Sequence, residues 1–332
     1  MSVKCSSPLA GGTLSFFMKI SGFSFSRNAA KLYYPVKESI LSILPIVDEF
    51  VIAVGDNDED DTTLAQIESI NSDKVKVIRT KWDIEKFPNG TEHAHQTNIA
   101  KDACSGDWLI YLQADELIHE DDHKTILSAC ESNLDNERVE GFLFNYYHFY
   151  GDYDHYNNLH GWYPREIRIV RNKPDIYSFI SAQSFRRIPE FDGLSYRDKT
   201  GTLKLNVKAI DAHIYHYGWV RPPELMQKKS RYFYTTHLGK KGMEEKYANS
   251  PDYWDYGNMS KLTKFEGTHP AVMKGFIDKF HWGDRLHFEK DYVPNRPLWK
   301  HETLRNKVLT SVEKNLLGGK TLFGYSNWNL ID

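Results

Sequence analysis

The chain has 332 residues, of which 40% are hydrophobic and 26% charged, the ordinary balance of a soluble globular protein. This length allows one large domain or two modest ones. The formal net charge of -3 does not support a broad nucleic-acid-binding surface. Cys5, Cys104 and Cys130 are widely spaced and form no C-x-x-C pair. This spacing argues against a disulfide framework or a structural zinc site and favours a reducing compartment.

The sequence shows no clear targeting or membrane-spanning segment. No apolar run approaches the roughly 20 residues of a membrane span. Residues 1–17 lack the compact apolar stretch after a basic start that marks a signal peptide, so we interpret them as a loose tail and expect a cytoplasmic protein. Aromatic residues make up 14% of the chain, including 20 Tyr and 8 Trp, and such rings suit sugar-binding clefts and interfaces.

Between residues 19 and 117, strand-like and helix-like patterns alternate with short connections. Strands are predicted at 19–25, 49–54, 75–78 and 108–112, and helices at 29–44, 62–70 and 91–104. Thr91 is expected to cap the last of these helices. This alternation predicts an α/β fold with a mainly parallel sheet and right-handed crossovers.

After residue 117 the regular alternation stops. We predict a helix at 120–132, strands at 141–149, 165–170 and 210–217, and an irregular segment at 172–206. The second half is interpreted as antiparallel strands and loops that cover the end of the sheet. The predicted division is a main domain at 18–218 and a helical C-terminal extension at 219–332. Residues 301–317 form an amphipathic segment whose apolar stripe could contact a membrane, although packing onto the main domain is favoured.

Two acidic turns follow buried strands. The strand at 108–112 runs into Gln113-Ala114-Asp115-Glu116, and the strand at 49–54 runs into Gly55-Asp56 and further acids. Ligands of open α/β sheets bind beyond the carboxyl ends of the strands. Carboxylates placed there suggest a hard cation and a phosphate-bearing substrate. The alternative for either turn is a solvated acidic loop.

These segments resemble the family 2 glycosyltransferases of the GT-A fold, similar to the bacterial enzymes of surface-glycan and lipopolysaccharide synthesis. The resemblance covers about residues 18–118 and is extended more weakly by residues 165–171. It rests on four stretches: Phe25-Ser26-Arg27-Asn28, Asp48-Glu49-Phe50-Val51-Ile52-Ala53-Val54-Gly55-Asp56, Gln96-Thr97-Asn98-Ile99-Ala100 and residues 106–116.

The resemblance implies a Rossmann-like GT-A sheet, a nucleotide-sugar donor and a divalent metal, Mn²⁺ or Mg²⁺. It implies that Asp56 contacts the nucleoside and that Asp115 is the main acid of the family's D-x-D motif. Gln113 stands where that motif has its first Asp, and its amide oxygen brings no charge. This change weakens metal binding or requires Asp115, Glu116 and a further ligand to coordinate the metal. His216 is the candidate for that ligand, since imidazole suits Mn²⁺ better than Mg²⁺; a packed histidine is the alternative.

Further residues are assigned by the same resemblance. Arg27 and Asn28, at the end of the first strand, and Asn98, in the third helix, are expected near the donor; a surface salt bridge and an exposed helix residue are the alternatives for Arg27 and Asn98. An inverting transfer needs a base for the acceptor hydroxyl. The family uses a downstream carboxylate, and the unranked candidates are Glu166, Glu190 and Asp192. Aromatic residues that could line an acceptor groove, unless they belong to the core, are Trp162, Tyr163 and Trp219, with Arg221 beside them.

The predicted function is therefore a hexosyltransferase-like glycosyltransferase of the EC 2.4 class, inverting, acting on a glycan or glycolipid in cell-surface glycan synthesis. The predicted location is the cytoplasm, with peripheral contact at the inner face of the membrane left open. One alternative is a nucleotidyltransferase, which would require a Gly-rich phosphate loop where this chain has Ser26-Arg27-Asn28-Ala29. Another is a catalytically impaired carbohydrate- or nucleotide-binding protein of the same fold.

Overall fold

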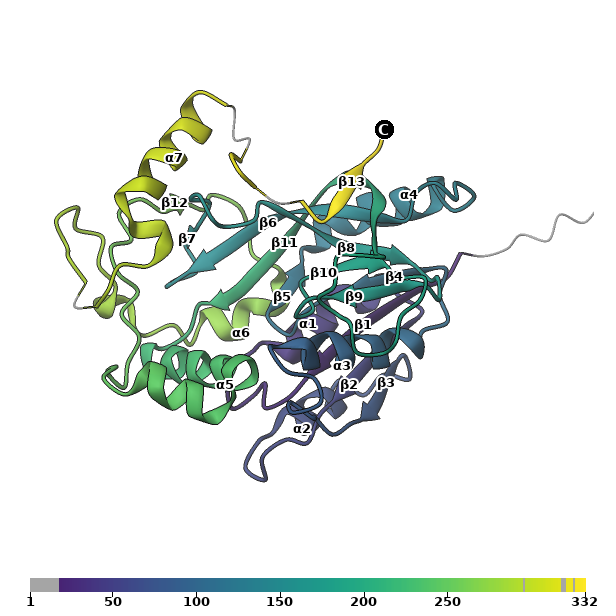
Figure 1. The fold of residues 1–332 in the computed structure, drawn as a ribbon, viewed down its shortest axis with the longest axis horizontal. Helices are drawn as coiled ribbons and strands as arrows, with labels where there is room; N and C mark the ends of the chain where they lie inside the picture. Colours follow the sequence, from purple (N-terminus) through teal and green to yellow (C-terminus); the bar gives the residue numbers. More distant parts are fainter. Residues whose placement is uncertain (1–17, 295, 318–320, 325) are drawn as a thin grey trace, which may run out of the picture.

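The computed structural model describes residues 18–294, 296–317, 321–324 and 326–332, and the predicted tail at 1–17 lies outside them. Within this part of the chain, the main path of the sheet runs in the order β3-β2-β1-β4-β8-β6-β11-β10-β9 (Figure 1). The strands of this path are β1 Ile20–Ser26, β2 Glu49–Val54, β3 Val75–Arg79, β4 Trp108–Tyr111, β6 Gly141–Tyr150, β8 Arg165–Arg171, β9 Ile176–Phe179, β10 Ser184–Arg187 and β11 Leu203–Trp219.

The first four strands are parallel to one another, as predicted. β8 is antiparallel to both β4 and β6. Two predictions for the second half are wrong. β6 and β11 pair in parallel, not antiparallel. The segment 172–206 is not irregular throughout, because it contains β9, β10 and the start of β11. β9 and β10 have only four residues each, too few for a clear periodic pattern.

Helices cover both faces of the parallel half of the sheet. On one face, α1 (Val36–Ile43) and α4 (His123–Ser132) add Ile40, Ile43 and Ile126 to a core with β2 and β4 residues. On the other, α3 (Thr91–Asp102) packs over β1 and β2 and contributes Ala100. Burial of these apolar side chains fixes the layers. The predicted α/β class with flanking helices is confirmed.

Two helix starts differ from the prediction. The first helix begins at Val36 rather than at residue 29, since Tyr33 has a φ of 60° and Pro35 occupies the N-cap position. The second helix, α2 (Thr63–Glu68), agrees closely with its prediction. The predicted N-cap at Thr91 is wrong, because Gly90 occupies that position with a φ of 78°. A positive φ of this kind favours glycine. Thr91 Oγ1 instead donates a hydrogen bond to the carbonyl oxygen of Pro88.

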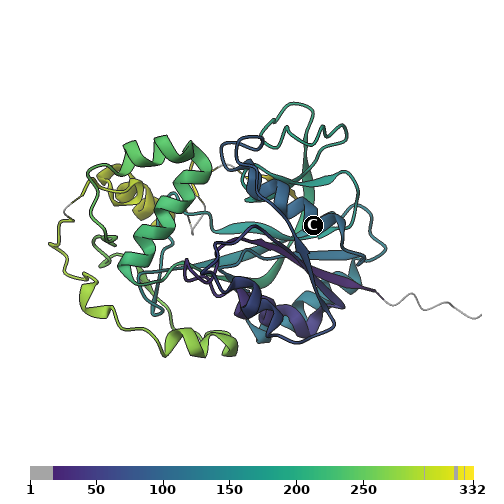
Figure 2. The same ribbon diagram turned by 90° about the horizontal axis from the view of Figure 1, so that it is seen from below.

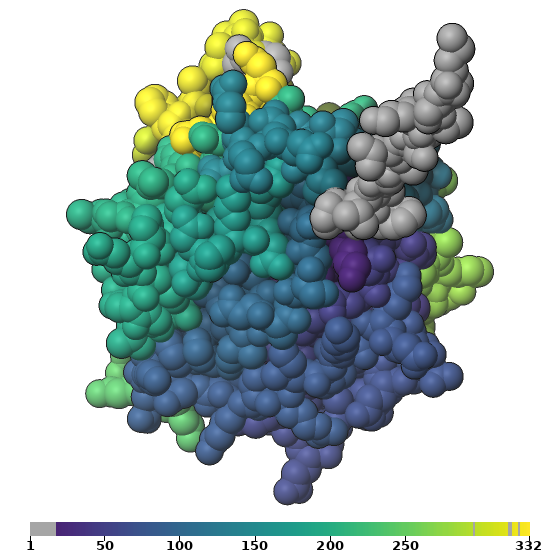
Figure 3. Space-filling model, turned by 90° about the vertical axis from the view of Figure 1, so that its right-hand side faces the viewer, coloured from purple at the N-terminus to yellow at the C-terminus, as the bar shows by residue number. Residues whose placement is uncertain are grey.

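The C-terminal part gathers at the end of the molecule away from β3 (Figures 1 and 2). Its helices alternate with long loop segments. Its regular elements are α5 Pro223–Tyr247, which kinks at Gly239, β12 Thr263–Lys264, α6 Lys274–Ile277, α7 Leu304–Asn315 and β13 Trp328–Leu330. β13 returns to the sheet and pairs in parallel with β11. No helix in the described ranges is long and apolar enough to cross a membrane. The opposite end of the molecule is built mainly by the first half of the chain (Figure 3).

The apolar stripe of α7 does not pack onto the main domain, so that expectation is wrong. Leu304, Val308 and Leu316 are 78%, 55% and 76% exposed. The buried side chains of α7 are polar and include Thr310 and Glu313. Glu313 accepts a hydrogen bond from the His160 ring, and the Thr310 hydroxyl accepts one from the His160 backbone N–H. These polar contacts hold the helix with its apolar side outward.

Candidate active-site cleft

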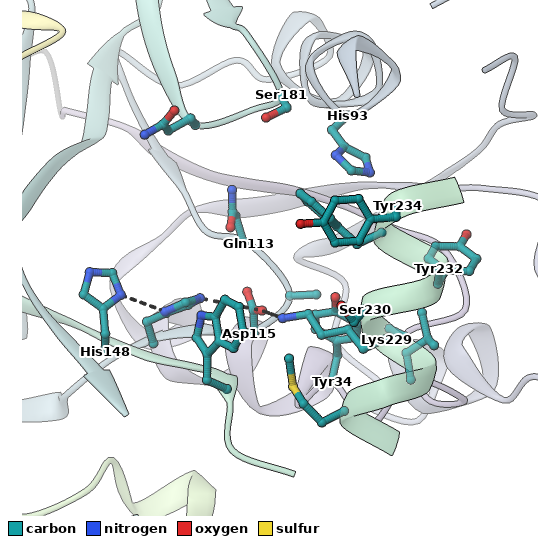
Figure 4. Close-up of a pocket in the computed structure, with 18 of the residues that line it drawn as sticks. Tyr34, His93, Gln113, Asp115, His148, Ser181, Lys229, Ser230, Tyr232 and Tyr234 are labelled. Atoms are coloured by element: carbon teal, nitrogen blue, oxygen red, sulfur yellow. Dashed lines mark hydrogen bonds and ion pairs between the residues drawn. The ribbon is translucent and has the colours of Figure 1, made fainter. Parts of the chain in front are cut away.

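A cleft of about 600 Å³ lies between the carboxyl ends of β1 and β4, the β6–β11 pair and α5 (Figure 4). This is the edge of the sheet at which the sequence predicted a site. Its lining is largely aromatic, with four histidines, and Asp115 is the carboxylate among the lining residues. A mostly apolar cavity with a few convergent polar groups is the usual form of a small-molecule site.

Asp115 is held at the cleft floor by strand pairing. The short strand β5 (Glu116–Ile118) pairs antiparallel with β11, with Glu116 opposite His216. The backbone N–H of Tyr217 also donates to the carbonyl oxygen of Asp115 at 2.8 Å. This pairing brings Asp115 Oδ2 to 3.7 Å from His216 Nε2. The structure therefore brings together two of the three predicted metal ligands.

The third predicted ligand, Glu116, is not among the cleft-lining residues. Its carboxylate makes a bidentate pair with Arg168 at 2.7 and 2.8 Å, and both side chains are fully buried. It also accepts hydrogen bonds from Tyr146 Oη and from the Gln113 backbone N–H. With its acceptors occupied inside the protein, Glu116 acts as a structural anion, and the correction to its predicted role follows from this pairing.

Lys229, on α5, is a site residue that the sequence interpretation missed. Its Nζ lies 3.5 Å from Asp115 Oδ2 and donates to the carbonyl oxygen of Gly218 at 2.6 Å (Figure 4). Burial and the nearby Arg221 lower the pKa of Lys229 to about 7, against the opposing effect of Asp115. Lysine pairs such as Lys228-Lys229 usually mark solvent-facing helix surface, so no local pattern signalled this position.

Burial raises the pKa of Asp115, but His216, Lys229 and Arg221 more than offset this and lower it below its ordinary value. Asp115 therefore remains a carboxylate although it is only 5% exposed. Burial also lowers the pKa of His216 to about 4 and that of His148 to about 3. Both imidazoles are accordingly neutral near physiological pH, the form in which histidine binds metals.

The donor set fits a divalent ion that also takes ligands from a substrate. A Cβ built on Gly218 would lie 2.5 Å from His216 Nε2 and 2.6 Å from Asp115 Oδ2, so glycine leaves open the space next to both atoms. No group of three or more His, Cys, Asp or Glu residues is arranged for a metal within the described residues. Divalent ions in phosphate-transferring sites are commonly held by one or two side chains and by substrate phosphates. One carboxylate and one imidazole suit such an ion.

Gln113 lines the cleft but does not replace an acid as a charged ligand. Its Nε2 donates to the carbonyl oxygen of Ala182 at 2.9 Å. Ala182 lies in the turn between β9 and β10 and has a φ of 58°. The amide of Gln113 therefore holds this turn against the end of β4, a role for which its N–H donor is required and an aspartate would be unsuitable.

Of the residues predicted near the donor, Arg27 lines the cleft and the others support it from outside. Arg27 Nε lies 3.3 Å from Asp56 Oδ1, and Asp56 Oδ1 also accepts from the backbone N–H of Trp82. Asn28 joins the two strand-end turns, since its Oδ1 accepts from the backbone N–H of Asp58. Asn98 is buried in α3, and its Oδ1 accepts from the backbone N–H of Ser178. Neither Asp56, Asn28 nor Asn98 lines the cleft.

None of the three predicted bases lines the cleft. Glu166 is buried on β8, where its Oε1 accepts from Ser184 Oγ and from the Ile167 backbone N–H. Glu190 and Asp192 are exposed. Asp192 accepts hydrogen bonds within its own loop, from the backbone N–H groups of residues 194 and 195. The structure thus separates these carboxylates from the acid at the cleft floor.

Aromatic side chains form the remaining walls. Near Arg27, the lining includes Phe25, Trp82 and His93, whose rings are in mutual contact. Beyond His216, the predicted Trp162, Tyr163 and Trp219 do line the cleft, whereas Arg221 does not. This second wall also includes Trp254 and Trp299, stacked at 4.8 Å. Among the described residues, the buried indole N–H groups of Trp82, Trp254 and Trp299 have no hydrogen-bond partner.

Comparisons with known proteins give matches only among solved structures. No family model matches the chain, and no curated protein matches it. The chain is similar to S. aureus TarS (17% identity, 65% of this chain and 39% of that chain, TM-score 0.37). It is also similar to residues 1–349 of TarS in complex with UDP-GlcNAc (16% identity, 69% of this chain and 70% of that chain, TM-score 0.35).

A further match is glucosyl-3-phosphoglycerate synthase from Mycobacterium tuberculosis in complex with Mn²⁺, uridine diphosphate and phosphoglyceric acid. Its identity is 18%, it covers 40% of this chain and 43% of that chain, and its TM-score is 0.26. The chain thus spans less than half of the full TarS and synthase chains that it matches. At these identities and TM-scores, the function has to be inferred from the cleft itself.

Proposed function

We propose that this chain is a GT-A glycosyltransferase that moves a sugar from a nucleotide-diphosphate donor to a glycan or glycolipid hydroxyl with inversion. The observation that carries the proposal is the convergence of Asp115, His216 and Lys229 at the strand ends, inside an aromatic cleft. A carboxylate, a neutral imidazole and an amine in one place can bind a diphosphate together with a divalent ion. Aromatic rings on both sides of the cleft offer faces against which a nucleobase and sugar rings can pack.

The donor would lie across the floor of the cleft. Lys229 and Arg27 line it and can donate to phosphate oxygens, and guanidinium and ammonium groups are the usual phosphate-binding cations. Asp56 fixes the Arg27 side chain in place rather than contacting the nucleoside through its own carboxylate. The rings of Phe25, Trp82 and His93 offer faces on which a nucleobase can stack.

We assign Asp115 and His216 as the residues that would hold Mn²⁺ or Mg²⁺, with Mn²⁺ preferred because imidazole is one of the ligands. A divalent ion bound there supplies positive charge to the leaving diphosphate. Asp115 also orients Lys229, whose ammonium group can form ion pairs with the phosphate oxygens. The apolar faces of the aromatic walls lower the local polarity and so strengthen these electrostatic interactions.

The acceptor would lie on the wall formed by Trp162, Trp219 and Trp299. Inversion requires a group on that side that accepts the hydroxyl proton. His301 lines the cleft there, with its ring 5.9 Å from that of Trp162. Its imidazole has a ring nitrogen whose lone pair can accept a proton. We therefore assign His301, rather than Glu166, Glu190 or Asp192, as the candidate base.

Calorimetric titration with UDP, GDP, CDP and dTDP, each with Mn²⁺ and with EDTA, tests the proposal. We expect one nucleotide to bind, its sugar conjugate to be hydrolysed slowly, and Lys229→Met to weaken binding by about tenfold or more, as for a lost charged hydrogen bond. Lys228→Met, at an exposed neighbouring position, is the matched control. Binding of none of the four nucleotides under either condition would overturn the proposal. Binding without turnover of any donor would favour an impaired binding protein. Release of pyrophosphate on incubation with a nucleoside triphosphate and a sugar 1-phosphate would favour a nucleotidyltransferase.

We also propose peripheral contact of α7 with the anionic inner face of the membrane, where glycolipid acceptors occur. Its exposed apolar stripe of Leu304, Val308 and Leu316 is flanked by exposed basic side chains, among them Arg305 and Lys307. Exposed apolar residues next to cations are typical of interfacial helices. Sedimentation with phosphatidylglycerol vesicles should carry the protein down, and a Leu304→Asp, Leu316→Asp variant should stay in solution. Failure of the unmodified protein to sediment would refute this contact and leave the transferase proposal intact.

A further inference from the structure

His148, which no sequence pattern singled out, is buried beside His216. Strands β6 and β11 are parallel neighbours, and their register places His148 opposite His216. The two Nδ1 atoms are 2.9 Å apart, and His148 Nε2 lies 2.8 Å from the carbonyl oxygen of Tyr163. The three groups form a chain that leads from a backbone carbonyl to the floor of the cleft.

This chain of hydrogen bonds determines where the protons are. The Tyr163 carbonyl can only accept, so His148 Nε2 must carry a proton. His148 is 2% exposed, and a second proton would bury a charge with no carboxylate paired to it, which is costly. Its Nδ1 is therefore an acceptor, and His216 Nδ1 is the donor of the 2.9 Å bond. The remaining nitrogen of His216, Nε2, is left with its lone pair.

That lone pair faces a second electron-pair donor. His216 Nε2 and Asp115 Oδ2 are 3.7 Å apart, and Gly218 leaves the adjacent space open. Two such donors repel each other unless a cation lies near both. Lys229 meets this need only in part, since its ion pair is with Asp115. The arrangement is suited to a metal ion that takes one ligand from each residue.

We propose that His148 is a positioning residue: with the Tyr163 carbonyl, it fixes the tautomer and ring orientation of His216 so that Nε2 is presented to a metal ion at Asp115. The inference rests on the metal-holding role given to Asp115 and His216 in the proposed function. Residues that hydrogen-bond to the other ring nitrogen of a ligating histidine normally fix its orientation, and their loss weakens metal binding by about 10- to 100-fold. The proposed role of His148 is exerted through His216.

Three variants separate positioning from simple packing. His148→Phe keeps the ring shape, which packs against the rings of Tyr146 and Trp162, but removes the acceptor. His148→Asn puts an amide oxygen close to the position of Nδ1, so it can still accept from His216. His148→Gln can donate to the Tyr163 carbonyl through its amide N–H but places no acceptor at the position of Nδ1, and it replaces the Phe variant if that protein does not fold. Thermal melting establishes that each variant is folded.

The readouts are Mn²⁺ affinity, titrated by electron paramagnetic resonance with UDP, GDP, CDP or dTDP present, and the nitrogen modulation of bound Mn²⁺ in pulsed spectra. We expect the unmodified protein to show imidazole nitrogen coordination. His148→Phe should weaken Mn²⁺ binding by about 10- to 100-fold and lose that signal, and His148→Asn should stay within a few-fold.

Equal affinity and an equal nitrogen signal in His148→Phe would overturn the positioning role, as would equal losses in folded Phe and Asn variants. Nucleotide binding to the unmodified protein without nitrogen coordination of Mn²⁺ would overturn it while leaving the transferase proposal standing. Absence of nucleotide binding under every condition would remove both.

Discussion

Two polar regions lie side by side at the end of β4, and they are built from adjacent residues. The cleft floor contains Asp115, whose Oδ2 lies 3.5 Å from Lys229 Nζ and 3.7 Å from Nε2 of the neutral His216 imidazole. The buried cluster contains Glu116 and Arg168, whose atoms meet at 2.7 to 2.8 Å with no exposure to solvent. Full pairing leaves the buried cluster no capacity for a ligand, whereas the cleft floor retains that capacity. One acidic motif is thereby divided into a functional half and a structural half.

The largest expected effect is on stability, from Glu116→Gln. This substitution leaves the buried Arg168 without its counter-charge, and breaking a buried pair in this way costs about 3–5 kcal/mol. Chemical denaturation should show a correspondingly lower free energy of unfolding. A stability unchanged from that of the unmodified protein would mean that the buried cluster is not the structural half.

We expect Asp115→Asn to lower donor turnover and to leave the stability of the protein nearly unchanged. The substitution removes the charge at the cleft floor while the backbone bond from Tyr217 remains, so the protein should stay folded. Donor turnover should fall by about 10²–10³-fold, as for loss of a group that stabilises transition-state charge. Steady-state kinetics and a melting curve test both parts. An equal loss of stability in Asp115→Asn and Glu116→Gln would mean that the cleft floor and the buried cluster do not differ in their contribution to folding.

The pH dependence of folding stability tests the surroundings of Glu166, which lies near the buried Arg168. Burial raises the pKa of Glu166 from 4.5 to about 7, although Arg168 opposes the shift. Between these values the folded protein holds a proton that the unfolded chain has released, so stability falls as pH rises through this window. At about 1.4 kcal/mol per pKa unit, the loss is at most on the order of 3 kcal/mol.

Glu166→Gln keeps the acceptor for Ser184 and should flatten this pH dependence while raising stability above pH 7. Denaturation curves across the window measure the slope. A slope as steep as that of the unmodified protein would exclude Glu166 as its source.

The smallest expected effect comes from Asp192→Asn and Glu190→Gln. Both side chains are exposed, and neither lines the cleft. Turnover should therefore stay within about twofold of the unmodified enzyme, because surface substitutions of this kind usually change little. A large loss of turnover in either variant would return these acids to consideration as the base and displace His301.

The sequence by itself determined the parallel half of the sheet and the position of the site at its edge. Alternating patterns over residues 19–117 are local, and buried central strands require nearly continuous apolar runs, so β1, β2 and β4 could be predicted closely. The carboxyl ends of parallel strands share one edge, which placed Asp115 beside the end of β1 without any tertiary information. The proximity of His216 to Asp115 agreed with a prediction that came from family resemblance.

Only the tertiary structure decided how the acids divide and what surrounds them. Glu116 and Arg168 are 52 positions apart, and Asp115 and Lys229 are more than twice as far apart, so no local pattern connects them. The same holds for His148 and His216, which meet because β6 and β11 are parallel neighbours. Asp115 and Glu116 differ in their surroundings because the turn at residues 114–115 ends where β5 begins at Glu116, so that one side chain lines the cleft and the other is buried in the core.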